Sequence, residues 1–556
     1  MTPVLKHLRP GFSVWGAGTG VVCLLIGLPI LAVFYLCLGD NKGIWQHLAS
    51  TVLPNYITTS LLLMLGVGVC TLFIGVLTAW LVTMCRFPGS RFLEWGLLLP
   101  IAMPSYLIAF VYTDLLEYAG PVQGLLRDIF GWSSPQDYYF FEIRSLGGAI
   151  SMMSLTLYPY VYLLSRAAFL EQCLCVLEVS RTLGSGAWGS FLRVALPLAR
   201  PSIVIGLSLV LMESLNDFGT VDFFAVKTFT AGIFDVWFNM NSVAGAAQIA
   251  VVLLLFILAL IALERWGRGQ RSFQHATGKY APISPAQITG WKGWLLSIAC
   301  FSPVLLGFAL PTSILLKYAI THYQATLEAN CISFFVNSLL LSGSAALICT
   351  LVGLFLVYGV RLSGSAAIKA AARFASTGYA IPGAVLAVGI MIPFGAIDNT
   401  IDAFMRNSFG ISTGLLLSGT TGAVIFGYVV RFLALGFGSA ESGLVKVTPS
   451  LEGASRTLGA GPLATLGRLH FPLIRSSLLT AVLLVFVDCM KELPLTIILR
   501  PFNFETLATF VYQYASDELL EEASLAALTI VATGILPVIL LSMGIRQGRP
   551  GEKAAE

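Results

Sequence analysis

Two apolar segments of the sequence each carry a pair of carboxylates four residues apart. The segments are "MESLNDFGTVDFF" (Met212–Phe224) and "VDCMKELPLTIIL" (Val487–Leu499). The candidate path residues are Glu213, Asn216 and Asp217 in the first and Asp488, Lys491 and Glu492 in the second. An ionisable group inside a membrane segment costs roughly 2.5–3.5 kcal/mol on insertion scales and usually faces a bundle interior or a water-filled path. Residues four apart share a helix face, so we expect these groups to line a translocation path.

Internal pairing is the alternative interpretation of these acids. Asp488 and Glu492 flank Lys491 and would neutralise it, whereas the first segment has no basic residue nearby. A path lined by unpaired carboxylates would favour a cation and disfavour an anion. The chain has five scattered histidines and its cysteines lie mostly within apolar runs, so we expect no fixed metal site.

A second candidate site is a mostly polar loop that occurs twice, 275 positions apart. "EVSRTLGSGAWGSFLRVALPLARP" (Glu178–Pro201) and "GASRTLGAGPLATLGRLHFPLIRS" (Gly453–Ser476) share ten of 24 residues. A solvated turn explains each glycine and proline separately, but it does not explain the same spacing twice. We expect a short helix, a glycine bend and a second amphipathic stretch that transmits force to a cytoplasmic partner. The residues assigned to this contact are Glu178, Ser180, Arg181, Gly184 and Pro197 in the first copy and Glu452, Ser455, Arg456, Gly459 and Pro472 in the second.

A third candidate is the acidic stretch "SDELLEE" before the last apolar run. Its acids are Asp517, Glu518, Glu521 and Glu522. A helix start favours acidic residues because of the helix dipole, and this is the simpler interpretation. Docking of an external protein is the sharper hypothesis.

The elements that carry these sites are predicted to be membrane helices. Of the 556 residues, 57% are hydrophobic and 11% are charged, which is typical of a polytopic membrane protein. Continuous apolar runs favour helices of about 20 residues over a barrel. The twelve predicted spans are near Val14–Leu38, Tyr56–Cys85, Leu93–Leu116, Gly147–Phe169, Pro201–Val221, Ala244–Leu263, Trp291–Leu316, Ser333–Val360, Ala375–Ile397, Thr413–Gly436, Ser476–Leu493 and Ala523–Met543. The fold class is therefore all-α.

The repeat extends beyond the loop and divides the chain into two tandem six-helix halves. "AMPSYLIAF" (Ala102–Phe110) matches "AIPGAVLAV" (Ala380–Val388) at an offset of 278, and "TSLLLM" matches "NSLLLS" at the same offset. An even number of helices gives both halves one orientation, so a pseudo-two-fold axis along the membrane normal should relate them. The expected boundaries are 1–263 and 291–546 for the two halves, with loops at about 171–200 and 446–475, a linker at 264–290 and a tail at 547–556.

The basic residues predict the orientation. With both termini inside, the inner segments hold 22 of the 32 lysines and arginines and the outer loops hold seven. Cytoplasmic loops collect lysine and arginine, so both termini and both repeated loops are expected in the cytoplasm. The net charge of +4 then follows from topology and does not point to nucleic acid.

The repeated loop resembles the coupling motif of permease subunits of ABC importers. That motif reads Glu-Ala-Ala, three residues, Gly, nine residues, then Ile-x-Leu-Pro. Glu178, Gly184 and Pro197 occupy its positions in the first copy, whereas in the second copy the acidic residue Glu452 sits one place early. The resemblance implies an inner-membrane permease that is not an enzyme, two copies of a cytoplasmic ATPase subunit and a periplasmic binding protein. The chain has no G-x-x-x-x-G-K-[ST] phosphate loop, so we expect it to bind no cofactor, with ATP and Mg²⁺ used by the partner.

The segments "NDFGTVDFF" and "KELPLTIILRP" resemble those of fused, two-domain ferric-iron permeases. This resemblance covers nearly the whole chain and favours ferric iron as cargo, in keeping with the preference of hard cations for oxygen ligands. Thiamine, phosphonate, polyamine and sulfate remain alternatives within the same class. A secondary transporter or channel is the competing class, although it has no reason to repeat a cytoplasmic coupling loop.

Overall fold

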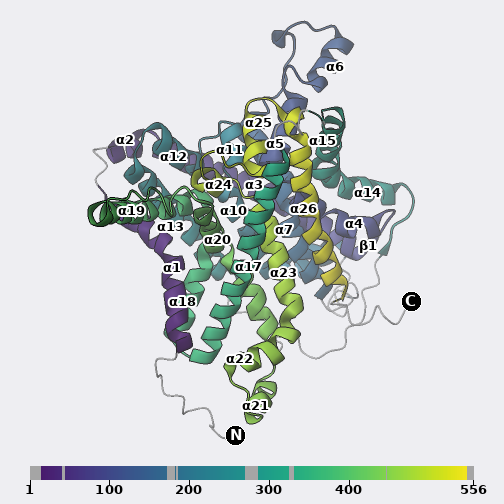
Figure 1. The fold of residues 1–556 in the computed structure, drawn as a ribbon. Helices are drawn as coiled ribbons and strands as arrows, with labels where there is room; N and C mark the ends of the chain where they lie inside the picture. The colour runs from purple at the N-terminus through teal and green to yellow at the C-terminus, as the bar shows by residue number, and fades with distance from the viewer. Residues whose placement is uncertain are drawn as a thin grey trace. The chain divides into compact units, whose positions relative to one another are not determined.

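The structure, a computed structural model, describes residues 14–39, 44–171, 182, 186–268, 286–322, 324, 331–445 and 447–547. These residues are helical almost throughout, which confirms the all-α prediction (Figure 1). The strands of the described part, β1 (Cys85–Arg86) and β2 (Ala286–Gln287), have two residues each and pair in parallel. In a hydrocarbon layer a helix satisfies its backbone hydrogen bonds within its own segment, which accounts for the predominance of helices.

Ten helices of the described residues are long and apolar enough to cross a membrane. An eleventh span is a helix pair, Ser90–Ala102 and Ser105–Phe130, bent by 90°. Together they match eleven of the twelve predicted spans. The remaining predicted span coincides with α7 (Leu146–Glu171), a 26-residue helix whose serines, tyrosines and internal proline make it less apolar.

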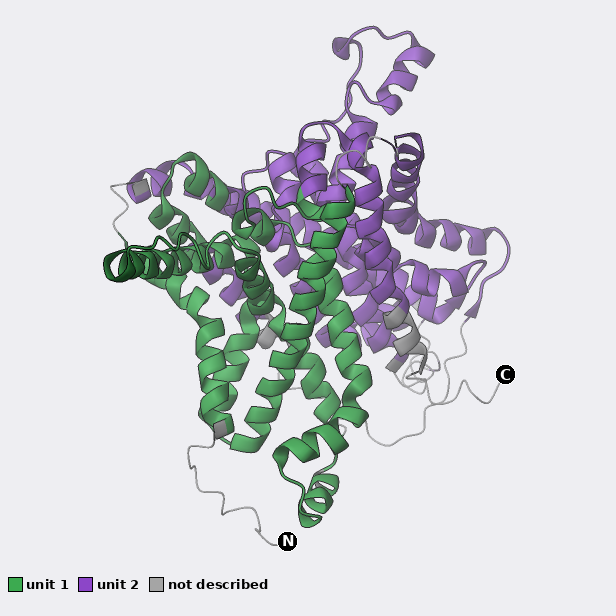
Figure 2. Cartoon of the chain, viewed as in Figure 1, with its two compact units in different colours: residues 1–44, 233–251, 331–509 green, residues 45–232, 252–330, 510–556 purple. Residues whose placement is uncertain are grey.

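The chain divides into two compact units (Figure 2). Unit 1 comprises residues 1–44, 233–251 and 331–509, and unit 2 comprises residues 45–232, 252–330 and 510–556. The helices of unit 1 are α1 (Val14–Cys37), α17 (Cys331–Ser363), α18 (Ala366–Ala375), α19 (Gly383–Phe409), α20 (Thr421–Val445), α21 (Pro449–Thr457), α22 (Pro462–Thr465), α23 (Phe471–Met490) and α24 (Pro494–Leu499). Those of unit 2 are α3 (Leu53–Met84), α4 (Ser90–Gly96), α5 (Ser105–Leu116), α6 (Pro121–Phe130), α7, α9 (Ala187–Ser190), α10 (Leu196–Asn216), α11 (Gly219–Phe223), α14 (Trp291–Val304), α15 (Leu310–Thr321) and α26 (Leu520–Gln547). A unit boundary falls at or within α2 (Ile44–Thr51), α12 (Phe229–Phe234), α13 (Val243–Arg268) and α25 (Leu507–Ser516).

The units cut across the two halves of the sequence repeat: unit 1 includes residues 1–44 and 233–251 of the first half, and unit 2 includes the first helices and residues 510–556 of the second half. In unit 1, α1 lies against α17, α18 and α19. The approach is close, since a Cβ on Gly389 would lie 2.2 Å from the carbonyl oxygen of Pro29. In unit 2, α14 and α15 pack with helices of the first half, and α15 also packs against α26. The expected boundaries at 263 and 291 stay a prediction about the sequence repeat, whereas the compact units are assembled from both halves.

The same glycine position brings two helices together in each half. In unit 2, a Cβ on Gly75 of α3 would lie 2.8 Å from Val161 of α7. In unit 1, a Cβ on Gly353 of α17 would lie 2.6 Å from Gly436 of α20. Gly75 and Gly353 are 278 positions apart, which is the offset found in the sequence. Small residues let membrane helices approach closely, where packing replaces the missing hydrophobic drive.

We expect Gly353→Ala to destabilise the permease. The added methyl group would overlap the backbone of α20, and overpacking of this kind costs about 1–3 kcal/mol. The unfolding midpoint in detergent should fall by about 3 °C or more. Gly343→Ala is the matched control in the same helix, because a Cβ there meets nothing within 4 Å. Equal midpoints for the two variants would contradict the packing.

Candidate coupling loops and translocation path

The second repeated loop folds as the sequence predicts. Helix α21 begins after Thr448 and ends at Thr457, and Gly459 then turns the chain with a φ of 81°. This left-handed conformation strains residues that carry a Cβ. The chain continues through α22 and a π-helical turn, Leu466–His470, into α23. Pro472 is the second residue of α23. Its missing N–H costs no hydrogen bond there, because the first N–H groups of a helix have no partner within the helix.

The described part of the first loop leads into its membrane helix in the same way. A π-helical turn, Phe191–Ala195, leads into α10, whose second residue is Pro197. The two π-helical turns are 275 positions apart, as are the two prolines. Turns of this kind are rare and concentrate at functional sites. The assigned residues Glu178, Ser180, Arg181 and Gly184 lie outside the described residues.

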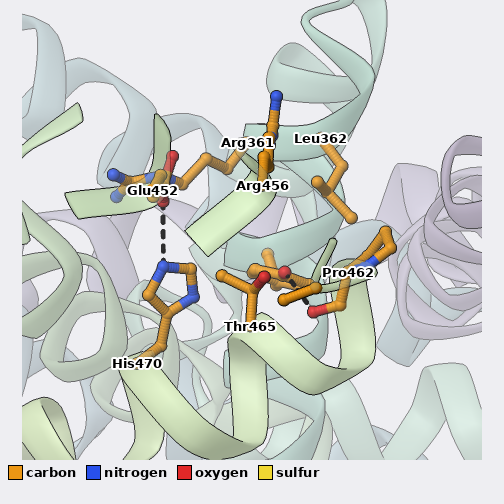
Figure 3. Close-up of a pocket in the computed structure, with 9 residues that line it drawn as sticks. Arg361, Leu362, Glu452, Arg456, Pro462, Thr465 and His470 are labelled. Atoms are coloured by element: carbon orange, nitrogen blue, oxygen red, sulfur yellow. Dashed lines mark hydrogen bonds and ion pairs between the residues drawn. The ribbon is translucent and has the colours of Figure 1, made fainter. Parts of the chain in front are cut away.

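Glu452 connects α21 to two membrane helices (Figure 3). Its carboxylate lies 2.8 Å from Nε of Arg361 at the end of α17 and 2.9 Å from Nε2 of the buried His470. Tyr358, also on α17, donates a hydrogen bond to the carbonyl of Pro462. These groups surround a small cavity of about 160 Å³. Glu452 therefore links any displacement of α21 to α17 and to the start of α23. It stands one residue before the acidic position of the motif, and its side chain contacts these membrane helices.

The outer face of the second loop is apolar and basic. The side chain of Leu458 is 87% exposed, and Leu451 and Leu463 are exposed with it. Arg456 is also exposed, whereas Ser455 hydrogen-bonds Thr465 within the loop. These exposed leucines are a candidate contact surface for a partner, and that role stays a prediction.

The fifth helix of the first half ends before its second acid. Helix α10 ends at Asn216, and α11 begins at Gly219. Between them, the side chain of Asp217 accepts hydrogen bonds from the backbone N–H and the hydroxyl of Thr220, the second residue of α11. Asp217 thus caps a short helix, as aspartate commonly does. Neither Glu213 nor Asp217 forms an ion pair within the described residues. Asn216 is 4% exposed, and its amide has no hydrogen-bond partner among the described residues.

The second half repeats this break with different charges. Helix α23 ends at Met490, and the carboxylate of Glu492 accepts the N–H of Leu495 in α24. Lys491 lies 2.9 Å from Asp488, so this pair fits the internal-pairing interpretation. The expectation that both acids of a half share one continuous helix face is wrong, because both helices end between them. Glu492 also pairs with Arg431 of α20, which the sequence analysis did not single out. An arginine inside a predicted membrane span was the signal for it.

The acids before the last helix are partly engaged within unit 2. Glu521 and Glu522 occupy the first turn of α26, as the helix-dipole interpretation predicts. Glu518 lies 3.3 Å from Arg144, and Glu521 lies 3.2 Å from His322. Asp517 is exposed between α25 and α26. Docking of an external protein at this stretch stays a prediction.

Comparisons with known proteins agree with this architecture. Residues 71–270 match the family described as "Binding-protein-dependent transport system inner membrane component". The chain is 25% identical over 533 residues to the Fe(3+)-transport system permease protein FbpB 2 of Haemophilus influenzae, covering 94% of this chain and 97% of that protein. It is 23% identical to the ferric transport system permease protein FbpB of Actinobacillus pleuropneumoniae, covering 92% and 75%. It is 30% identical to the sulfate transport system permease protein CysT of Escherichia coli, covering 40% and 77%.

The all-helical membrane scaffold and these matches together define a transport permease. The chain belongs to the family of inner membrane components of binding-protein-dependent transport systems. It is the membrane-embedded permease component of an ABC importer and a multi-pass protein of the inner membrane. Such an importer works with a periplasmic binding protein and an ATPase partner.

We expect Gly459→Val to weaken attachment of the ATPase. A left-handed residue with a Cβ costs about 1–2 kcal/mol, so the bend after α21 should shift. Gly461→Val is the matched control, because Gly461 also has open space around it but its φ is −72°. Co-purification of the ATPase with the permease measures the effect. Equal recovery with both variants, at equal membrane insertion, would refute the role of this bend.

Proposed function

We propose that this permease imports ferric iron, delivered by a periplasmic binding protein and driven by two copies of a separate ATPase subunit. The observation that carries the proposal is the match to a ferric permease over 94% of this chain and 97% of that relative. The sulfate permease matches 40% of this chain, which corresponds to one half of the repeat. Two loops of one pattern in one chain favour two ATPase copies.

The path acids of unit 2 support a cationic cargo. Glu213 and Asp217 lie at the end of α10 and form no ion pair within the described residues. Carboxylate oxygens are ligands that hard cations prefer. We assign the cargo-facing negative charge to these two residues, whereas Asp488 is balanced by Lys491.

The test is uptake into vesicles that hold the purified permease with its ATPase. Radiolabelled Fe(III), offered on the loaded binding protein, should enter when ATP and Mg²⁺ are present on the ATPase side. Sulfate, thiamine, a phosphonate and a polyamine, each with its own binding protein, form the comparison set. Uptake of one of these in place of iron would overturn the cargo assignment and leave the importer class intact.

Neutral variants of the path acids should reduce iron uptake. Glu213→Gln and Asp217→Asn remove charge at nearly constant size, and asparagine keeps the cap on α11. Together they should lower the initial rate about tenfold, the equivalent of roughly 1.4 kcal/mol of lost attraction for the cation. ATP hydrolysis without cargo should persist. Asp128→Asn, at an exposed position on α6, is the control, and normal uptake by the double variant would make the acids structural.

The orientation of the chain is part of the proposal. Both termini and both coupling loops are placed in the cytoplasm, because the inner segments hold 22 of the 32 basic residues. Reporter domains fused after Gly184 and after Gly459 should report the cytoplasm. A fusion after Gly410, at the end of α19, should report the periplasm. The same compartment at Gly410 and Gly459 would refute the two-half topology.

A further inference from the structure

Unit 1 contains a buried ion pair at the break between α23 and α24. Nη1 of Arg431 lies 3.3 Å from Oε1 of Glu492, and both residues are 6% exposed. The contact is longer than an aligned hydrogen bond between charged groups, which is about 2.7–2.9 Å. Nε and Nη1 of Arg431 have no hydrogen-bond acceptor among the described residues. The pair is therefore held by charge and by the surrounding packing.

Gly383 leaves the space that the pair occupies. It is the first residue of α19, directly after Pro382. A Cβ on Gly383 would lie 2.4 Å from Nη1 of Arg431 and 2.7 Å from Oε1 of Glu492. A side chain at this position would require the ends of the Arg431 and Glu492 side chains to move. The start of α19, the middle of α20 and the start of α24 consequently meet at one tightly filled point.

Hydrogen bonds fix α24 at the same point. Oε1 of Glu492 accepts the N–H of Leu495, and the hydroxyl of Thr496 donates to the carbonyl of Glu492. The hydroxyls of Thr496 and Tyr428 lie 2.6 Å apart, which adds a second link to α20. Movement of α24 away from α20 would have to break the ion pair and this link together.

We propose that Arg431 is a positioning residue that keeps the unit 1 side of the translocation path closed at rest by holding Glu492 and α24 against α19 and α20. The inference rests on the proposed function, because the path is placed along the fifth helices. A buried charge without its partner is strongly unfavourable, so the pair favours the one arrangement in which the charges meet. An opening of the path would separate them and would need the energy of the ATPase.

The equivalent position in unit 2 has no buried ion pair within the described residues. Asp217 stands 275 positions before Glu492 and caps α11 in the same way. Within the described residues it has no cationic partner. At the sequence position equivalent to Gly383, unit 2 has Ser105, whose hydroxyl hydrogen-bonds Thr156. The closing contact is thus expected in one half only.

The first test uses Gly383→Ala in the purified permease–ATPase complex in nanodiscs. The added methyl group would separate Arg431 from Glu492, and a weaker closed state shifts the population towards open conformations. ATP hydrolysis without any binding protein should rise about threefold or more. Gly395→Ala, in the same helix with nothing within 4 Å of its Cβ, should hydrolyse ATP at the wild-type rate.

A second variant tests the same inference in case Gly383→Ala does not fold. Arg431→Met combined with Glu492→Gln removes both charges, so neither is left buried alone. This double variant should also raise hydrolysis without binding protein. Wild-type hydrolysis by both variants, or reduced assembly with unchanged hydrolysis per assembled complex, would overturn the inference. A wild-type complex that no loaded binding protein stimulates would instead refute the proposed function.

Discussion

The structure depends on the cost of leaving a polar group without a partner inside the hydrocarbon layer. Backbone groups meet this constraint by forming helices, and the described residues contain almost no other regular structure. The constraint is most demanding where a membrane helix must stop. In both halves the fifth helix stops beside a carboxylate, Asp217 or Glu492, and that carboxylate accepts the free N–H groups of the short helix that follows. Each helix can end here because a carboxylate accepts a backbone N–H that the break leaves without a helical partner.

These acids consequently serve two requirements at once. A carboxylate that caps a helix has directed lone pairs and a fixed position, and it still carries its charge. In unit 1 the charges are balanced locally, by Lys491 for Asp488 and by Arg431 for Glu492. In unit 2 no ion pair is formed by the corresponding acids in the described residues. The backbone of the two halves at this break is therefore repeated more faithfully than the charges around it.

The sequence predicted the features that local spacing controls. The repeat offsets, the bend at Gly459 and the entry of Pro472 into a helix all follow from residues close in the chain. The end of α10 at Asn216 was missed, although Gly219, like Pro494 in the second half, marks the start of a new helix. The partner of Glu492 was missed for a different reason. Arg431 lies far earlier in the chain, and one sequence contains no spacing that joins two such positions.

The exchange of first helices has a consequence for how the chain is made. Helix α1 is synthesised long before α17, α18 and α19, the helices whose surfaces it covers in unit 1. Contacts between segments so far apart in the sequence form slowly. During this interval α1 must wait in the lipid, where its exposed apolar residues are already compatible with their surroundings. The bilayer thus acts as a holding compartment for an early helix whose binding site does not yet exist, and insertion and folding become separate events in time.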